Sequence, residues 1–183
     1  MNYAKQYCFD AIKAIAAGVV ISFGATVFLM QENRMFSSFL FSLGLFVVCT
    51  FNLNLFTGKV GFLADHPLKN LPLVLICWGG NFVGMLGSSM ILRTTRIGDT
   101  HAANGQALVD LKSGDNLWSH FDLGIYCGLL MYIAVGCFSR GKDKPGPNLV
   151  GYVGIFMSVM MFIHCGFEHS IANMYYYMVS GNM

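Results

Sequence analysis

Five apolar stretches, each about as long as a helix that crosses a lipid bilayer, occupy most of this 183-residue chain. A helix needs roughly 20 mainly apolar residues to cross the hydrocarbon core of a membrane. In chain order the five stretches are Ile12–Met30, Met35–Gly58, Leu71–Leu92, Leu123–Ser139 and Pro147–Gly166. Their number and length predict an all-α membrane protein, because a spanning helix satisfies its own backbone hydrogen bonds.

The scarcity of charged residues supports this class. Charged residues make up 11% of the chain and hydrophobic residues 55%, whereas soluble domains average about 25% charged residues. The net charge is +2, and no basic run alternates with aromatic residues, so no nucleic-acid partner is expected. The six cysteines lack CxxC and zinc-ligand spacing. No nucleophile motif, phosphate loop or carboxylate pair indicates an enzyme, and we expect no metal and no cofactor.

The lysines and arginines between the apolar stretches predict the orientation, since cytoplasmic loops carry more of them. With the N-terminus inside, six lie in the cytoplasm: Lys5, Lys13, Lys69, Arg140, Lys142 and Lys144. Four then lie outside: Arg34, Arg93, Arg96 and Lys112. The N-terminal sequence has no cleavage site typical of a signal peptide. We therefore predict a multi-pass protein of the bacterial inner membrane with a cytoplasmic N-terminus.

Polar residues and glycines interrupt two of the apolar stretches. The second ends in FNLNLFTGK (51–59), and the fifth runs into CGFEHSIANM (165–174). Such interruptions in two halves of a chain indicate an inverted repeat whose broken helices line a site near the membrane midplane. We expect one channel domain over residues 1–183, with halves of about 1–97 and 98–183 and an incomplete second half. Glu168 and His169 are then expected in a re-entrant pore loop.

The stretch GFEHSIANM (166–174) resembles the formate/nitrite transporter family, whose members include formate, nitrite and hydrosulfide channels. A second stretch, NLFTG (54–58), is similar to the other loop of that family. The resemblance implies an aquaporin-like inverted-repeat helical bundle with two broken helices, assembled as a homopentamer with one pore per protomer. The family has six spanning segments, so this chain is expected to lack the last one. LFTGKVG and CGLLMYIAV are most similar to the hydrosulfide and clostridial branch.

The resemblance also implies roles for individual residues. His169 matches the central pore histidine of the family, and Thr57 matches the loop threonine that faces it. Lys112 falls where the family has a lysine in the vestibule that precedes the fourth helix. The hydrophobic constrictions would be formed by Phe162 on one side and by Phe41, Leu45 and Leu55 on the other.

Three further residues complete the candidate site. Asn173 belongs to the GFEHSIANM motif and is taken as a pore residue. Gly128 stands where the family often has an asparagine, which would remove a hydrogen-bond partner near His169. Glu168 is interpreted as a structural carboxylate that accepts hydrogen bonds from backbone N–H groups of its loop.

The resemblance therefore implies a channel for small monovalent anions such as formate, nitrite or hydrosulfide. A bare charge in hydrocarbon is costly, whereas the neutral acid crosses an apolar constriction more easily. Lys112 would attract the anion, which is protonated deeper in the pore because the falling dielectric raises the pKa of the acid. His169 would then hydrogen-bond the permeating molecule together with Thr57, or donate the proton. The apolar constrictions exclude hydrated ions by dewetting.

Two alternatives remain open from the sequence. One is a membrane redox subunit that binds haem through His164, His169 or His120. The other is a truncated, non-conducting remnant of the family. The expected partners are small anions, membrane lipid and further copies of the chain.

Overall fold

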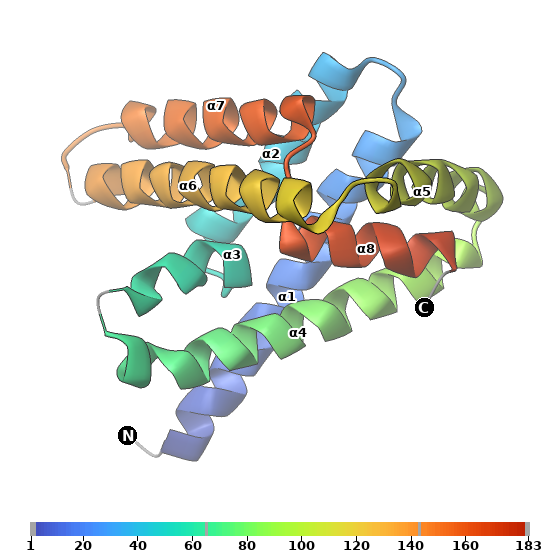
Figure 1. Ribbon diagram of the computed structural model, residues 1–183. Helices are drawn as coiled ribbons and strands as arrows, with labels where there is room; N and C mark the ends of the chain where they lie inside the picture. The colour runs from blue at the N-terminus through green and yellow to red at the C-terminus, as the bar shows by residue number, and fades with distance from the viewer. Residues whose placement is uncertain (1–2, 65, 143, 182–183) are drawn as a thin grey trace.

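The computed structural model describes residues 3–64, 66–142 and 144–181, and all their regular structure is helical (Figure 1). The helices are α1 (Tyr3–Met30), α2 (Arg34–Thr50), α3 (Phe56–Lys59), the 3₁₀ helix η1 (Val60–Leu63), α4 (Pro67–Arg93), α5 (Gly98–Ser113), α6 (Leu117–Lys142), α7 (Leu149–Cys165) and α8 (Ser170–Ser180). The predicted all-α fold is confirmed. Each of the five apolar stretches contributes a helix.

Three of these helices, α1, α4 and α6, are long and apolar enough to cross a membrane. Helices α7 and α8 pass the same criteria together and are bent by 51° at the break between them. Helix α2 has 17 residues and ends at Thr50, so the predicted stretch Met35–Gly58 is not one continuous helix. Helix α6 extends beyond the predicted Leu123–Ser139 at both ends. Its last turn includes Arg140 and Lys142, whose positive charges interact favourably with the dipole at a helix C-terminus.

The polar segment between the third and fourth apolar stretches folds into α5, which packs against α8 (Figure 1). Arg93, at the end of α4, ties the same region together. Its guanidinium donates hydrogen bonds to the carbonyls of Met178 at 3.1 Å and Val179 at 3.2 Å. A cation satisfies the free carbonyls of a helix C-terminus and interacts favourably with the helix dipole. The last described helix is therefore held to α4 at its C-terminal end.

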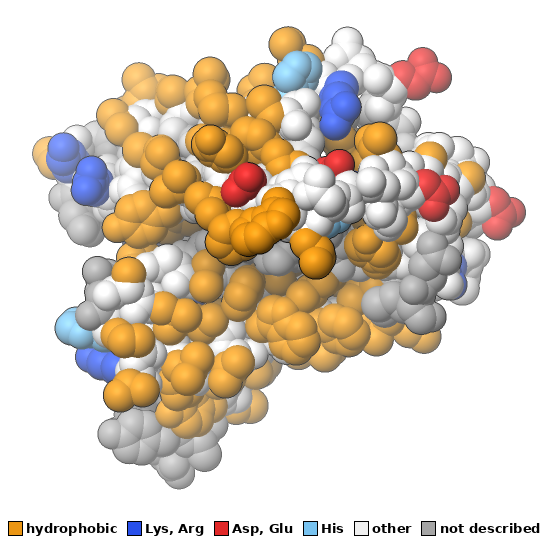
Figure 2. Space-filling view, in the orientation of Figure 1, with side chains coloured by type: hydrophobic (Ala, Val, Ile, Leu, Met, Phe, Trp, Pro, Cys, Tyr) orange, Lys and Arg blue, Asp and Glu red, His pale blue; other side chains and the backbone are white. Residues whose placement is uncertain are grey.

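Large apolar side chains cover much of the outside of the molecule. Phe23 is 63% exposed, Ile91 70% and Tyr132 55%. Figure 2 shows hydrophobic side chains over most of one face, with lysines and arginines near its left edge. An exposed apolar surface of this extent marks contact with lipid or with another protein. In a protein with membrane-spanning helices, these side chains face the bilayer or neighbouring subunits.

Helices α1 and α4 cross at very close range. A Cβ atom added to Gly84 of α4 would lie 2.2 Å from the carbonyl oxygen of Ile15, and one added to Gly18 of α1 would lie 2.3 Å from the carbonyl oxygen of Asn81. Small residues let two membrane helices approach closely, so that dispersion contacts hold them together. This contact fixes the side of α4 that carries Asn81 against α1.

Candidate functional site

The two broken helices end in the same way. Asn52 after α2 and Gly166 after α7 both adopt left-handed backbone conformations, with φ of 51° and 74°. In each case the next N–H bonds back to a carbonyl five residues earlier, Leu53 to Val48 and Phe167 to Phe162, both at 2.9 Å. This is the Schellman arrangement that ends a helix and turns the chain away. It brings the loops at 51–55 and 166–169 back into the bundle.

The segments that follow the two breaks meet at Thr57, in α3, and His169, just before α8. The hydroxyl oxygen of Thr57 lies 3.0 Å from Nε2 of His169, although 112 residues separate them in the chain. The other ring nitrogen, Nδ1, accepts the backbone N–H of Ala172 at 3.1 Å, so His169 is the N-cap of α8. Because Nδ1 is an acceptor, the neutral ring carries its proton on Nε2 and donates it to Thr57.

Apolar rings and side chains surround this pair. The ring of Phe162 stacks on the imidazole of His169, with centroids 5.1 Å apart and planes 13° apart. Phe41 meets Phe162 edge to face at 6.2 Å. Together with Leu45 and Leu55, these aromatic residues are at most 2% exposed. The residues predicted for the two constrictions therefore lie in one buried apolar cluster beside His169.

Asn81 in the middle of α4 holds the first loop in place. Its side-chain oxygen accepts the N–H of Phe56 at 2.8 Å, and its amide donates to the carbonyls of Ala14 at 2.7 Å and Asn54 at 3.0 Å. The side chain is fully buried. Asn81 thus joins α1, α4 and the start of α3, which carries Thr57. Asn81 was not predicted as a site residue from the sequence, although a polar residue inside an apolar stretch is a recognised signal of function.

Lys112 and Glu168 form an ion pair next to this centre. The distance from Nζ to Oε1 is 2.6 Å, and the two side chains are 11% and 12% exposed. The other carboxylate oxygen of Glu168 accepts a hydrogen bond from the Asn173 amide, and Nδ1 of His120 lies 3.9 Å from Oε1. The expectation that Glu168 accepts loop backbone N–H groups is therefore wrong. The N–H groups of Ala172 and Asn173, in the first turn of α8, bond to His169 instead.

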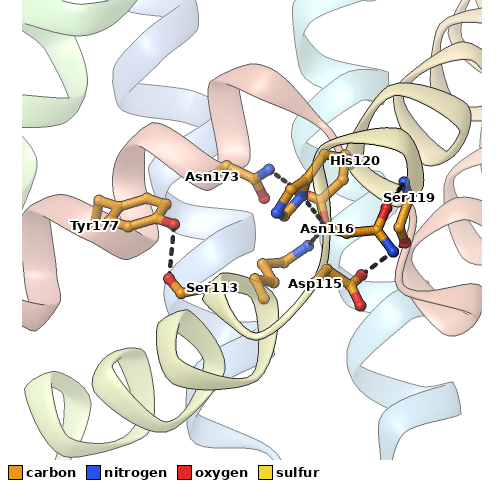
Figure 3. A network of polar contacts seen from close by, with 9 residues as sticks. Ser113, Asp115, Asn116, Ser119, His120, Asn173 and Tyr177 are labelled. Carbon is orange, nitrogen blue, oxygen red and sulfur yellow. Dashed lines mark hydrogen bonds and ion pairs between the residues drawn. The ribbon is translucent and has the colours of Figure 1, made fainter.

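The turn between α5 and α6 helps to hold Lys112 and Glu168 in position (Figure 3). Ser119 bonds to Asn116 and Asp115 within this turn, and the hydroxyl of Ser113 lies 3.2 Å from that of Tyr177 on α8. In Figure 3, Asn173 faces the turn from α8. These contacts fix the end of α5, where Lys112 lies, against α8.

A small hollow of about 20 Å³ adjoins the ion pair, and we call it the Lys112 hollow. Its lining includes Arg34, Lys112, His169, Asn173 and Tyr176. Arg34, predicted from the sequence only as a loop charge, also lines this candidate site. Its position in the sequence could have indicated this placement. Arg34 precedes Phe41 by seven residues and Leu45 by eleven, which places all three on one helix face.

Two residues that the sequence suggested for the site, Gly128 and His164, lie apart from this centre. Gly128 is exposed on α6, and a Cβ atom added there would meet nothing within 4 Å. It therefore does not adjoin His169 in the structure. His164, one of the alternative haem ligands, is exposed whereas His169 is buried. Within the described ranges, no group of three or more His, Cys, Asp or Glu side chains is placed to hold a metal ion.

Comparison with known proteins identifies the family. The sequence profile "Formate/nitrite transporter" matches residues 11–182. The chain belongs to the formate/nitrite transporter family. Among curated family members, it is 29% identical over 158 residues to the formate channel FocA of Haemophilus influenzae, covering 78% of this chain and 52% of that protein. It is also 29% identical over 186 aligned positions to FocA of Escherichia coli K12, with 88% and 62% covered.

Solved structures of formate/nitrite transporters have the same fold. One described as "Pentameric formate channel with formate bound" matches with a TM-score of 0.80 and 23% identity, covering 96% of this chain and 75% of that one. Another, described as "FNT family ion channel", matches with a TM-score of 0.73 and 19% identity, covering 98% and 75%. This chain spans about half to three fifths of the length of the curated relatives.

Proposed function

We propose that this chain forms a membrane pore for small monovalent anions such as formate, nitrite or hydrosulfide. The observation that supports this most directly is the contact between Thr57 and His169. It joins the two broken helices at a polar point enclosed by buried apolar side chains. Intramembrane ionisable residues that face a protein interior mark substrate pathways. The relatives named as formate channels support the same class of substrate.

In the proposed mechanism, the permeating molecule crosses the apolar cluster as the neutral acid. The anion is attracted at the Lys112 hollow, where Arg34 and Lys112 carry positive charge. Lys112 is held by Glu168, so this pair contributes little net charge. Beyond it, the apolar cluster favours the protonated form because a bare charge is costly there. His169 and Thr57 then supply the polar groups that replace water.

The hydrogen bonds of His169 favour a hydrogen-bonding role over proton donation. Protonation of Nδ1 would remove the acceptor of the Ala172 N–H and uncap α8. Nε2 already carries a proton in the neutral ring and donates it to Thr57. The Thr57 hydroxyl is then free to donate its own proton to an oxygen or sulfur atom of the permeating molecule.

We further propose a homopentamer in a bacterial inner membrane, with the N-terminus in the cytoplasm. The solved relative described as a pentameric formate channel supports the assembly. The exposed apolar side chains supply surface for contacts with lipid and with neighbouring subunits. The distribution of lysines and arginines supports the orientation.

The test is formate entry into liposomes that contain the purified chain. His169→Ala is expected to lower the rate roughly tenfold, since one hydrogen bond is worth about 1 to 1.5 kcal/mol. His164→Ala is the matched control, because His164 lies five residues earlier and is exposed; it should keep the wild-type rate. Absence of formate flux from intact, oligomeric wild-type protein would overturn the proposal.

A further inference from the structure

A second hollow lies at the opposite end of α2 from the Lys112 hollow. It has a volume of about 110 Å³ and is lined by residues that include Leu45, Asn52, Leu55, Lys59, Ser139 and Lys142. We call it the Lys59 hollow. Helix α2 begins at Arg34 in the Lys112 hollow and reaches Cys49 in this one. Fifteen residues of helix separate the two by about 22 Å.

The apolar cluster forms the inner end of the Lys59 hollow. Leu45 and Leu55 line it and are 2% and 1% exposed, and both belong to the constriction beside Phe41 and His169. At the outer end Asn52 and Lys142 are exposed. The hollow therefore leads from the surface to the apolar cluster from the side opposite Lys112.

The polar groups of this hollow suit an anion. Lys59 ends α3 and Lys142 ends α6, so two separate helices each bring one ammonium group to it. The Asn52 amide and the Ser139 hydroxyl add neutral donors. No aspartate or glutamate is among its described lining residues.

The two hollows differ in how their cations are balanced. Lys112 has a carboxylate at 2.6 Å. In the part of the chain that the structure describes, neither Lys59 nor Lys142 has a carboxylate within 4.0 Å. Charges of one sign in a cleft with low-dielectric walls raise the local concentration of small ions of the opposite sign.

We infer that the Lys59 hollow is a second binding site for small monovalent anions, at the mouth of the pore opposite Lys112. This inference rests on the proposed function for its role in transport. An anion then meets positive charge before the apolar cluster from either side. Lys59 also lies two residues from Thr57, so the attracting charge and the hydrogen-bonding hydroxyl belong to one short segment.

The test places a fluorescent reporter in the Lys59 hollow and compares quenching by iodide, a monovalent anion, with quenching by neutral acrylamide. Phe62 lines the hollow and is half-buried, so Phe62→Trp is the reporter, with both native tryptophans, Trp78 and Trp118, changed to Phe. The double variant Lys59→Gln/Lys142→Gln is expected to lower the iodide quenching constant roughly threefold to tenfold. The acrylamide constant should stay unchanged.

The matched control removes the same charge elsewhere. Lys69 and Lys144 are exposed, lie on the predicted cytoplasmic side and do not line the hollow. Lys69→Gln/Lys144→Gln should therefore leave iodide quenching close to that of the parent reporter. Replacing gluconate in the buffer with formate at constant ionic strength should reduce iodide quenching in the parent reporter. It should not do so in the Lys59→Gln/Lys142→Gln variant. Phe138, which also lines the hollow, provides a second reporter as Phe138→Trp if Phe62→Trp disturbs folding.

Three results would overturn the inference: a reporter that acrylamide does not reach, equal loss of iodide quenching in both double variants, or no competition by formate. Quenching needs no permeation, so the outcome is separate from the flux experiment. If wild-type protein binds anions in the hollow but passes no formate, the proposed function is overturned while the inferred anion site stands.

Discussion

His169 uses its two ring nitrogens for different tasks. Nδ1 caps α8 through Ala172, and Nε2 reaches Thr57 on the other broken helix. The stacked ring of Phe162 keeps the imidazole plane fixed between them. One side chain therefore sets both the start of a helix and the distance between the two loops, which explains why it is buried despite its polarity.

At the same scale, the Lys112–Glu168 pair leads to a prediction. Glu168→Gln keeps the shape of the side chain but leaves the Lys112 charge unbalanced, so the site should attract anions more strongly. The formate concentration at half-maximal flux is expected to fall roughly threefold to tenfold, as one added unit charge at short range implies. Flux measured across a concentration series checks this.

Glu168→Asp is the control, because it retains the charge and should keep a half-saturating concentration near that of the wild type. If Glu168→Gln instead raised this concentration, the carboxylate would be acting on the permeating molecule rather than balancing Lys112.

Thr57, His169 and Leu55 could be predicted because they belong to the short motifs NLFTG and GFEHSIANM. Phe41, Leu45 and Phe162 followed from the positions of the constrictions in the family that the chain resembles. The sequence did not predict the partner of Glu168. Lys112 lies 56 residues away, and its position depends on the folding of the polar segment into α5, whose helical pattern is not amphipathic. Nor did it predict Asn81, whose three partners come from α1, α3 and the loop before α3. Contacts of this kind depend on how helices cross.

Among the elements, the crossing of α1 and α4 leads to a second prediction. Gly84→Ala places a methyl group 2.2 Å from the Ile15 carbonyl oxygen, so the helices must separate. Overpacking of this kind costs about 1 to 3 kcal/mol. Because the separation also shifts Asn81, formate flux should fall with stability. Unfolding by denaturing detergent, monitored by circular dichroism, measures the loss.

Gly87 on the same helix provides the comparison, since an added Cβ atom there meets nothing within 4 Å. Gly87→Ala should leave stability unchanged or raise it by up to about 1 kcal/mol, because alanine favours the helix. Equal effects of the two substitutions would show that helix propensity, rather than the close crossing, decides stability at α4.

At the scale of the whole molecule, positive charge lies at both hollows and an apolar cluster lies between them. In the proposed mechanism, this arrangement attracts the anion but favours passage of the neutral acid. In the proposed pore, an anion would therefore meet an attracting charge whichever side it enters from. The asymmetry lies in the balance of charge, since only Lys112 is paired with a carboxylate in the described residues.

Passage of the neutral acid leads to a third prediction. A bare anion that crosses the membrane field gains or loses about 2.3 kcal/mol per 100 mV, whereas the neutral acid gains nothing. Formate entry into liposomes should therefore change by less than about twofold between 0 and −100 mV. A pH-sensitive dye in the lumen should report acidification as the acid dissociates inside.

The same experiment discriminates between the two forms of the permeating molecule. A rate that changes severalfold with a valinomycin-set potential, without acidification of the lumen, would mean that the anion itself crosses. In that case, the buried cluster would be a flexible gate rather than a barrier to charge.

The short lengths of α3 and α8 imply an order in which the helices settle into the membrane. With four and 11 residues, neither is long enough to be inserted into the bilayer as a separate span. Each must settle after its longer neighbours are already in the membrane, where Asn81 and Arg93 of α4 offer ready partners for the first loop and for the end of α8. We therefore expect Thr57 and His169 to meet only after α1 and α4 are in place, so that the proposed pore centre forms last.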